Sequence, residues 1–343
     1  MQLSARRGCA MMSPMLRLGR PAVLSAVSGR ALGACVLLAT LTLALGCGQA
    51  RPGRPIAVGA TSTLPRSHRS HVVVIVMENA EYGEVIGSPA APYVNALARR
   101  YGLATQSFAI THPSLPNYLA LTSGSTQGVS SDCTDCQVSA RSTVEQLEAA
   151  GISWRAYLED APTPCFRGAG AGGYAKKHNP FLYYRDVAGS PSRCDRLVGF
   201  AQLAADLRAG RLPSYVWLSP NLCDDGHDCG VAAGDRFLAR TVPALLRELG
   251  PHGFLILTWD EGSSDRGCCE VAHGGHIATI IAGPDVIGGG RDEQPIDHYG
   301  VLATIEEALG LPLLAGAADP QAGRLRSLFA RPPIRICCAA PRQ

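Results

Sequence analysis

The sequence predicts an α/β fold with a doubly wound, mostly parallel sheet sandwiched by helices. Two nearly continuous apolar runs, 72–77 and 254–259, are typical of strands buried on both faces of a parallel sheet. Helix patterns alternate with such strands along the chain, and no internal repeat is visible. The chain has 343 residues, 46% of them hydrophobic, and a net charge of +3, which fits one large domain. No basic stripe is present, so a nucleic-acid partner is excluded.

The first fifty residues predict an export signal. Arginines precede a low-polarity run over 31–45 that ends in small residues, which is the order found in cleaved signal peptides. The run is shorter than the roughly 18 apolar residues that a transmembrane helix needs. We therefore divide the chain into a signal peptide (1–46), a flexible leader (47–70), a folded domain (71–330) and a C-terminal tail (331–343).

Cysteine usage agrees with export. Of 13 cysteines, ten follow Cys47, and an even number in an exported chain predicts disulfides. Cys133 and Cys136 have the spacing of zinc ligands, but no second such pair follows, so disulfides are favoured. Cys223 with Cys229 is the pair most expected, because it closes a short loop. The protein is expected to be secreted or held in the cell envelope, and lipid attachment at Cys47 is the less favoured alternative.

The remaining elements follow from periodicity and from cap and turn residues. Ser142 and Glu145 have capping-box spacing at a helix start, and Pro243 is expected to kink the helix that contains it. The predicted strands are 72–77, 103–109, 154–158, 215–218, 254–259 and 277–282. The predicted helices are 92–101, 117–123, 142–150, 197–209, 235–249 and 299–309.

Between Asp160 and Cys194 the periodicity disappears. So long an irregular segment is usually functional or clamped, and Cys165 with Cys194 is the expected clamp. One interpretation is a disordered surface loop whose aromatic residues pack locally. The other is a lid whose cations bind a second anionic group and whose aromatics face a ring or a lipid interface. The residues concerned are Tyr174, Lys176, Lys177, His178, Phe181, Tyr183, Tyr184 and Arg185.

One stretch, 111–118 (THPSLPNY), presents a hydroxyl in a stiff backbone, because each of its prolines fixes its own φ and restricts the residue before it. Pro116 suits the first turn of a helix. Ser114 is therefore expected just outside a helix N-terminus, where free amides and the dipole favour an anion. His112 and Asn117 flank it with groups that can hydrogen-bond a phosphate.

Polar side chains follow three of the predicted strands. In doubly wound sheets ligands bind beyond the carboxyl ends of the strands, so these groups are expected to meet. Each has an ordinary explanation taken singly, such as a helix cap or a solvated turn. Together they predict a divalent metal held by oxygen and imidazole ligands. They are Glu78 and Asn79, Asn221 with Asp224–Asp228, and Asp260 with Glu261.

Four ordered motifs give the chain a family resemblance. VIVMEN ending at Asn79, THPSLPNY, SPN followed by DGHD, and TWDEG resemble the bacterial phosphoesterase family of the alkaline phosphatase superfamily. That family includes secreted acid phosphatases and phospholipases C. The likeness covers about 71–310 and is greatest to secreted acid phosphatases of the phosphatidylinositol-3-phosphatase type. It implies an alkaline-phosphatase-like fold and an exported phosphoric ester hydrolase.

The resemblance also implies site residues. Ser114 would attack phosphorus and form a phosphoseryl intermediate, assisted by one divalent metal of unspecified identity. Glu261 departs from zinc members of the superfamily, which have histidine there, and this favours one metal or weak metal dependence. The metal ligands implied are Glu78, Asn79, Ser114 and Asp260. The other catalytic residues are His112, Asn117 and His227, with phosphate or leaving-group contacts from Asn221, Glu261, Asp228 and His276.

Three functions remain open. Hydrolysis of phosphomonoesters is favoured over a phosphodiesterase of the phospholipase C type using the same residues, and over a non-catalytic exported binding protein. A serine esterase is disfavoured because the chain has no G-x-S-x-G motif. The expected substrate is a phosphorylated small molecule or a phosphoinositide, with transient contact to a membrane surface. The expected oligomeric state is a monomer.

Overall fold

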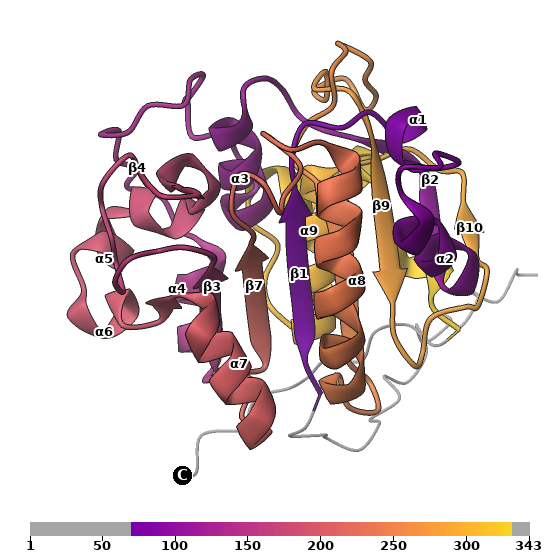
Figure 1. The fold of residues 1–343 in the computed structure, drawn as a ribbon. Helices are drawn as coiled ribbons and strands as arrows, with labels where there is room; N and C mark the ends of the chain where they lie inside the picture. Colours follow the sequence, from indigo (N-terminus) through magenta and orange to yellow (C-terminus); the bar gives the residue numbers. More distant parts are fainter. Residues whose placement is uncertain (1–69, 331–343) are drawn as a thin grey trace, which may run out of the picture. The chain divides into compact units, whose positions relative to one another are not determined.

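The computed structural model describes residues 70–330, so the expected signal peptide, all but the last residue of the leader, and the tail lie outside the described residues. The strands of the main sheet are β1 (Val72–Met77), β2 (Gly102–Phe108), β3 (Trp154–Leu158), β6 (Leu197–Val198), β7 (Tyr215–Ser219), β8 (Phe254–Trp259), β9 (His276–Ala282), β10 (Arg291–Asp292) and β11 (Ile296–Asp297). Their order is β10-β2-β9-β8-β1-β7-β3-β6, with β11 also paired to β2 (Figure 1).

The sheet is mixed but mostly parallel, which confirms the predicted fold class. Strands β6, β3, β7, β1 and β8 are parallel neighbours, whereas β9 runs antiparallel to both β8 and β2. The reversal follows from the connection. A loop over 260–275, with no crossover helix, joins β8 to β9, and a parallel neighbour would need such a crossover.

Helices cover both faces of the sheet, as predicted. Helices α2, α7 and α8 lie on one face, and α3, α4 and α9 on the other (Figure 1). Their buried side chains belong to two separate core clusters. The helices are α1 (Tyr82–Val85), α2 (Pro92–Arg100), α3 (Ser114–Ser123), α4 (Thr143–Ala149), α5 (Arg185–Ala188), α6 (Pro191–Cys194), α7 (Phe200–Ala209), α8 (Val231–Glu248) and α9 (His298–Leu309).

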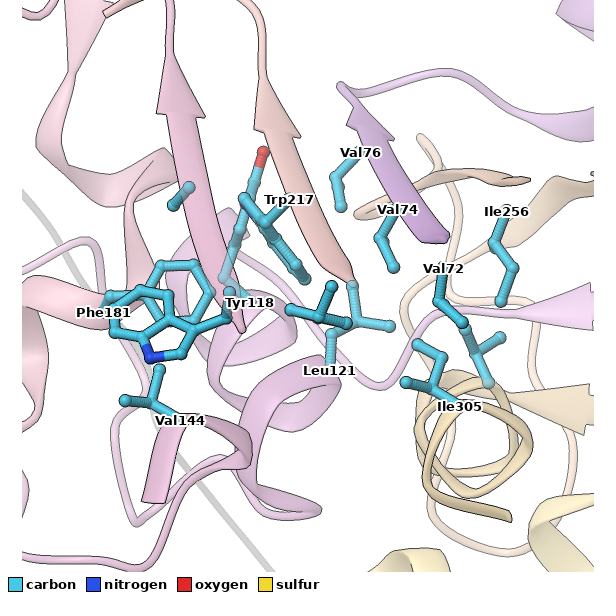
Figure 2. Close-up of a cluster of buried hydrophobic side chains, with 14 of the residues drawn as sticks. Val72, Val74, Val76, Tyr118, Leu121, Val144, Phe181, Trp217, Ile256 and Ile305 are labelled. Atoms are coloured by element: carbon cyan, nitrogen blue, oxygen red, sulfur yellow. The ribbon is translucent and has the colours of Figure 1, made fainter. Parts of the chain in front are cut away.

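Strand β1 lies between these two helical layers. Val72, Val74 and Val76 join the core on the α3 and α9 side, and the alternate residues join the core on the α8 side. Figure 2 shows the first set beside Ile256 and Ile305. Burying each such side chain contributes about 1.5–3 kcal/mol. Because both faces are covered, the strand is apolar at every position instead of alternating.

Two helices begin earlier than predicted. Helix α3 starts at Ser114, with Pro113 as its N-cap, so the expectation that Ser114 lies outside the helix is wrong. Pro116 does lie in the first turn, where its missing N–H costs nothing. Helix α8 starts at Val231 rather than at 235, and Pro243 lies inside it as expected.

The capping box expected at α4 is wrong. Ser142 is the N-cap residue, but its side chain makes no capping hydrogen bond. Glu145 pairs instead with Arg141, whose Nε lies 3.1 Å from Glu145 Oε1. The helix expected over 197–209 is divided into β6 and the shorter α7, because residues 197–198 pair with β3.

The irregular segment 160–194 is ordered, so the disordered-loop interpretation is wrong. It folds into a small hairpin of β4 (Gly170–Ala171) and β5 (Tyr174–Ala175), the 3₁₀ helices η1 (Lys176–His178) and η2 (Pro180–Tyr183), and α5 and α6. Its aromatic residues are buried in the main core, where Phe181 lies against Trp217 (Figure 2). The other buried aromatics are Tyr174, Tyr183 and Tyr184.

Four disulfides lie within the described residues, confirming the prediction of disulfides. Two had been expected as pairs, and the Cys133–Cys136 spacing belongs to a disulfide rather than to a zinc site. In residues 70–330 no helix is both long and apolar enough to span a membrane. The pairs are Cys133–Cys136, Cys165–Cys194, Cys223–Cys229 and Cys268–Cys269.

Candidate active site

The carboxyl ends of three neighbouring strands bring acidic residues together. Glu78 follows β1, Asp260 follows β8, and Asp225 lies in the turn after β7. Backbone hydrogen bonds fix this arrangement: Glu78 N donates to Asp225 O at 3.0 Å, and Asp260 N donates to Met77 O at 2.9 Å. The parallel order of the strands therefore places three carboxylates at one edge of the sheet, as expected for this fold class.

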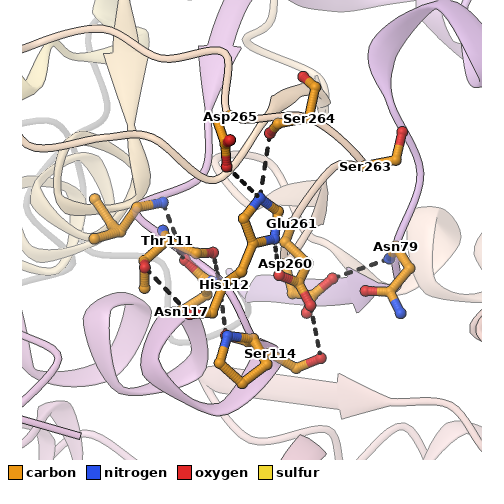
Figure 3. A network of polar contacts seen from close by, with 12 residues as sticks. Asn79, Thr111, His112, Ser114, Asn117, Asp260, Glu261, Ser263, Ser264 and Asp265 are labelled. Carbon is orange, nitrogen blue, oxygen red and sulfur yellow. Dashed lines mark hydrogen bonds and ion pairs between the residues drawn. The ribbon is translucent and has the colours of Figure 1, made fainter. Parts of the chain in front are cut away.

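Ser114, the first residue of α3, presents a buried hydroxyl to this edge. Only 1% of the residue is exposed. Its Oγ lies 3.1 Å from Glu78 Oε2. It also lies 3.2 Å from Glu261 Oε1 (Figure 3). A hydroxyl has one proton, so it donates to one carboxylate at a time, and each carboxylate is placed to accept that proton.

Asn117 holds the loop that carries Ser114. Its Oδ1 accepts from the backbone N–H groups of Ile110 and Thr111 at 3.0 and 3.1 Å. Its Nδ2 donates to the carbonyls of Thr111 and Pro113 at 2.7 and 3.2 Å (Figure 3). The amide expected to contact phosphate is thus committed to the backbone, and its part is to position the loop.

His112 stands behind Glu261. Its Nδ1 pairs with Glu261 Oε2, and its Nε2 lies 3.2 Å from the Ser264 carbonyl oxygen (Figure 3). Partial burial acts to lower the pKa of His112, but the bond and charge of Glu261 outweigh burial and raise it. Burial also raises the pKa of Glu261, against the opposing effect of His112. Ser114, Glu261 and His112 therefore form a connected hydroxyl–carboxylate–imidazole chain.

A second histidine, which the sequence reasoning did not assign to the centre, lies on the other side of Glu78. His178 of η1 is 2% exposed, with Nε2 3.3 Å from Glu78 Oε1 and Nδ1 3.1 Å from Asp225 Oδ2. One ligand atom from each of these three residues lies within 4.8 Å of the others. The Tyr118 hydroxyl donates to Glu78 Oε1. His178 was visible only as one polar residue of the irregular segment, and Tyr118 only as an aromatic in a helix.

Several buried atoms of this group have no hydrogen-bond partner within the described residues. They include both ring nitrogens of His178, Asp225 Oδ2 and Asp260 Oδ2. The His178 nitrogens lie close to Glu78 and Asp225, but these contacts are not hydrogen bonds. Burial raises the pKa of Asp225 to about 7 and that of Asp260 to about 8. Burial and the neighbouring Asp260 and Asp225 charges raise the pKa of Glu78 well above its usual range, and burial lowers that of His178. Unpartnered carboxylate oxygens beside a neutral imidazole are the ligand set of a divalent cation, so these residues fit a metal.

Lys177, His227 and Asp228 lie at the rim of the same centre. His227 Nδ1 lies 2.7 Å from Asp228 Oδ1, and His227 Nε2 lies 3.2 Å from Lys177 Nζ. The rings of His227 and His178 are 5.9 Å apart. The structure thus places His227 beside the centre, with Asp228 on its outer side.

Asn79 and Asn221 make hydrogen bonds away from Ser114, Asn79 through its backbone N–H and Asn221 through its side-chain amide. Asn79 is exposed, and its backbone N–H donates to Asp260 Oδ1 at 3.1 Å (Figure 3). Asn221 Oδ1 accepts from the N–H groups of Cys223 and Asp224 in a turn, and its Nδ2 donates to Asp160 Oδ2 at 2.9 Å. Neither side chain reaches Ser114 in this arrangement.

His276 is not part of the cluster. It begins β9, where its ring stacks on Tyr82 at 4.4 Å and on Phe108 at 5.0 Å between centroids. Its Nε2 lies 2.9 Å from the Thr105 carbonyl oxygen. The expected contact of His276 with a phosphate or leaving group disagrees with this packing. The antiparallel direction of β9 brings this residue to the same edge of the sheet as Asp260, but its ring is held between Tyr82 and Phe108 instead of facing Ser114.

Comparison with known proteins gives a consistent result. The model of the Phosphoesterase family matches residues 87–312, a range that begins after Glu78 and Asn79. The phosphatidylinositol-3-phosphatase of Mycobacterium tuberculosis is 34% identical over 257 residues, covering 74% of this chain and 80% of that protein. An acid phosphatase of Aspergillus fumigatus is 30% identical over 251 residues, covering 69% of this chain but only 54% of that protein.

Solved structures resemble the fold. A protein in the alkaline phosphatase superfamily from Vibrio parahaemolyticus gives a TM-score of 0.52 at 16% identity, covering 76% of this chain and 70% of that one. The lipoteichoic acid synthase of Listeria monocytogenes gives 0.52 at 10% identity, covering 77% and 76%. At such identities the likeness concerns the fold alone, and it confirms the alkaline-phosphatase-like architecture.

Proposed function

The chain belongs to the phosphoesterase family, as the sequence motifs implied, and from that premise we propose that it is an exported acid phosphatase acting on phosphomonoesters. One observation carries the proposal. The buried hydroxyl of Ser114 lies 3.1 and 3.2 Å from two carboxylates and next to an unpartnered group of metal-ligating side chains. Nucleophile, base and charge-neutralising site are thus within one cluster.

Ser114 acts as the nucleophile. A serine hydroxyl attacks poorly at neutral pH unless a neighbouring group takes its proton. Glu261 is the base, since its Oε1 faces Ser114 and its Oε2 is held by His112. Ser114 Oγ then bonds to phosphorus while the bond from phosphorus to the leaving oxygen breaks, which yields a phosphoseryl enzyme. Water next attacks phosphorus and gives a proton to His227, while the bond from phosphorus to Ser114 Oγ breaks. The proton held by Glu261 returns to Ser114, and phosphate is released.

Glu78, His178, Asp225 and Asp260 would hold one divalent cation. When bound, such an ion supplies positive charge that favours an ionised hydroxyl and offsets the charge of the phosphoryl group. Asn79 and Ser114, implied as ligands by the family resemblance, border this group without belonging to its buried, unpartnered part. Elemental analysis of the purified protein would identify the ion.

His227 protonates the leaving oxygen in this proposal. It lies at the rim, where a departing alcohol reaches solvent. In its protonated form it gives up the Nε2 proton, while Asp228 orients the ring through Nδ1. A phosphoinositide is a fitting substrate, since the M. tuberculosis relative is named a phosphatidylinositol-3-phosphatase. Its phosphomonoester would enter from the Lys177 and His227 side of the centre.

Ser114→Ala tests the nucleophile, with Thr111→Ala as the matched control. Thr111 has its hydroxyl in the same loop, where Oγ1 donates to the His112 carbonyl. We expect Ser114→Ala to fold normally and to lose about 10³-fold or more in kcat for p-nitrophenyl phosphate, because covalent catalysis is removed. Thr111→Ala should keep most activity. Mass spectrometry after an acid quench should detect a phosphoryl group on Ser114 of the wild type.

The opposite pattern, with Ser114→Ala active and Thr111→Ala inactive, would show that the nucleophile is assigned wrongly. Parallel assays with bis-p-nitrophenyl phosphate separate the two ester classes. Faster turnover of that diester than of the monoester would replace the proposal by a phosphodiesterase using the same residues. Full activity of a metal-free enzyme in chelator would remove the cation from the mechanism.

A further inference from the structure

A carboxylate from outside the catalytic cluster already occupies anion-binding groups beside Ser114. Asp132 lies in the connection between α3 and α4, next to the Cys133–Cys136 disulfide. Its Oδ1 accepts from the backbone N–H of Leu115 at 3.0 Å, and its Oδ2 lies 3.1 Å from Lys177 Nζ. The Asp132 carboxylate thus accepts from the Leu115 N–H at the start of α3 and pairs with the Lys177 ammonium at the rim.

These two donors are the ones that a phosphoryl group would need. Leu115 follows Ser114 directly in the first turn of α3, where free N–H groups and the helix dipole favour an anion. Pro116 has no N–H, so this turn has one amide donor fewer than usual. The substrate's equatorial oxygens must lie near Ser114 Oγ for attack, and the Leu115 N–H is the donor adjacent to it along the chain.

Lys177 contacts both Asp132 and the rim residue His227. Its Nζ lies 3.1 Å from Asp132 Oδ2 and 3.2 Å from His227 Nε2. Burial acts to lower the pKa of Lys177, but the charges of Asp132, Glu78 and Asp260 raise it overall, so the side chain is a cation. Its position between the cluster and Asp132 allows it to pair with either a carboxylate or a phosphate.

We propose that Asp132 competes with the phosphoryl group for Leu115 N–H and Lys177, and so sets the affinity of the centre for phosphate. The inference rests on the proposed function and concerns a phosphate dianion, whether it belongs to a substrate or to free orthophosphate. The Asp132 side chain is 28% exposed, in contrast to Glu78 at 0%, so it can turn into solvent at low desolvation cost. Its return to the two donors would help to expel the phosphate product.

Asp132→Asn removes the competing charge while keeping the shape. Asp135→Asn, which changes an exposed carboxylate in the same disulfide loop, is the matched control. We expect calorimetric titration of the full protein with orthophosphate to give about tenfold tighter binding in Asp132→Asn, which corresponds to about 1.4 kcal/mol. Binding by Asp135→Asn should stay close to wild type. Lys177→Met should weaken phosphate binding, because one of the two donors is gone.

Kinetics on p-nitrophenyl phosphate give a second readout. Asp132→Asn should lower KM and the inhibition constant of orthophosphate together, while kcat changes less or falls through slower product release. Unchanged or weaker phosphate binding in Asp132→Asn would overturn the inference and show that Asp132 only orients Lys177. If Asp132→Asn fails to fold, as judged by thermal unfolding, Asp132→Ser repeats the test with a smaller polar side chain.

The two proposals fail separately. Calorimetry needs no turnover, so tighter phosphate binding in a protein without phosphatase activity would contradict the proposed function and leave this inference standing. An active enzyme whose phosphate affinity is the same in wild type and Asp132→Asn would support the proposed function and contradict this inference. Titration with orthophosphate can be followed by titration with phosphoinositide vesicles. An equal gain in affinity for both would place the effect on the shared phosphoryl group.

Discussion

Two carboxylates lie within hydrogen-bond distance of the Ser114 hydroxyl, and their surroundings distinguish them. Glu78 is fully buried, accepts from Tyr118, and faces the further charges of Asp225 and Asp260. Such a group is suited to a cation. Glu261 instead has an imidazole behind it whose hydrogen bond and charge oppose the effect of burial on its pKa, so it can exchange a proton with less penalty. The residue that the family resemblance marked as a departure is therefore the better base.

Asp225→Asn tests the metal site at this scale. Removing one charged ligand while keeping the shape should lower bound divalent metal and activity together, by about tenfold or more in metal affinity. The neighbouring Asp224→Asn is the control, since Asp224 lies on the same turn but pairs with Arg240 at 3.4 Å. Elemental analysis and metal titration of both variants give the readout. Equal metal content in the two would contradict the assignment of Asp225 as a ligand.

Among the elements, the short turn after β7 contributes two residues to the proposed centre, Asp225 and His227. Cys223 and Cys229 close a loop with a sequence separation of 6, and Asp225 and His227 lie inside it. The Asp225 side chain also accepts from His227 N at 2.8 Å, and Glu78 N bonds to the Asp225 carbonyl. The disulfide thus constrains both Asp225, which we propose as a metal ligand, and His227 at the rim.

The double substitution Cys223→Ala with Cys229→Ala should lower kcat clearly while the domain stays folded. A loop this short gains about 2–3 kcal/mol or less from its crosslink, so the domain should remain folded. The freed turn should hold Asp225 less firmly, which lowers metal affinity and kcat. Activity assays and metal titration of the variant measure the functional loss, and thermal unfolding measures the change in stability. A variant with wild-type kcat and a much lower Tm would show that the disulfide serves folding alone.

For the whole molecule, a carboxyl buried far from the centre links stability to pH. Glu306 of α9 is fully buried, accepts from the N–H of Leu314, and has its pKa raised to about 8 by burial. Its folded-state pKa lies above the usual value near 4.5, so the folded protein binds the proton more tightly than the unfolded chain does. Stability should therefore fall as pH rises from about 4.5 to about 8.

Glu306→Gln should remove most of that loss. It keeps an acceptor for Leu314 and places an amide near Gln146, whose buried Oε1 has no partner within residues 70–330. Above pH 8 the variant should be more stable than wild type by about 2–4 kcal/mol, and below pH 4.5 the two should converge. Denaturant unfolding across this pH range measures the difference. Parallel pH curves for both proteins would mean that Glu306 is not the group that titrates.

The sequence by itself determined the fold class, the strand ends and the position of the Ser114 loop, because these depend on local patterns. Apolar runs such as Val72–Met77 specify a strand buried on both faces, and the parallel order then brings Glu78 and Asp260 to one edge. The disulfide between Cys223 and Cys229 was likewise readable from spacing.

Only the tertiary structure decided which polar groups meet. His178 reaches Glu78 from a segment 100 positions away, because the aromatics around it pack into the core and fix η1. Asn117 gives its amide to the backbone, and His276 packs its ring on Tyr82 and Phe108. Such contacts depend on strand direction and long-range packing, which no local period or spacing records, since a side chain's partners are set by the elements that fold against it.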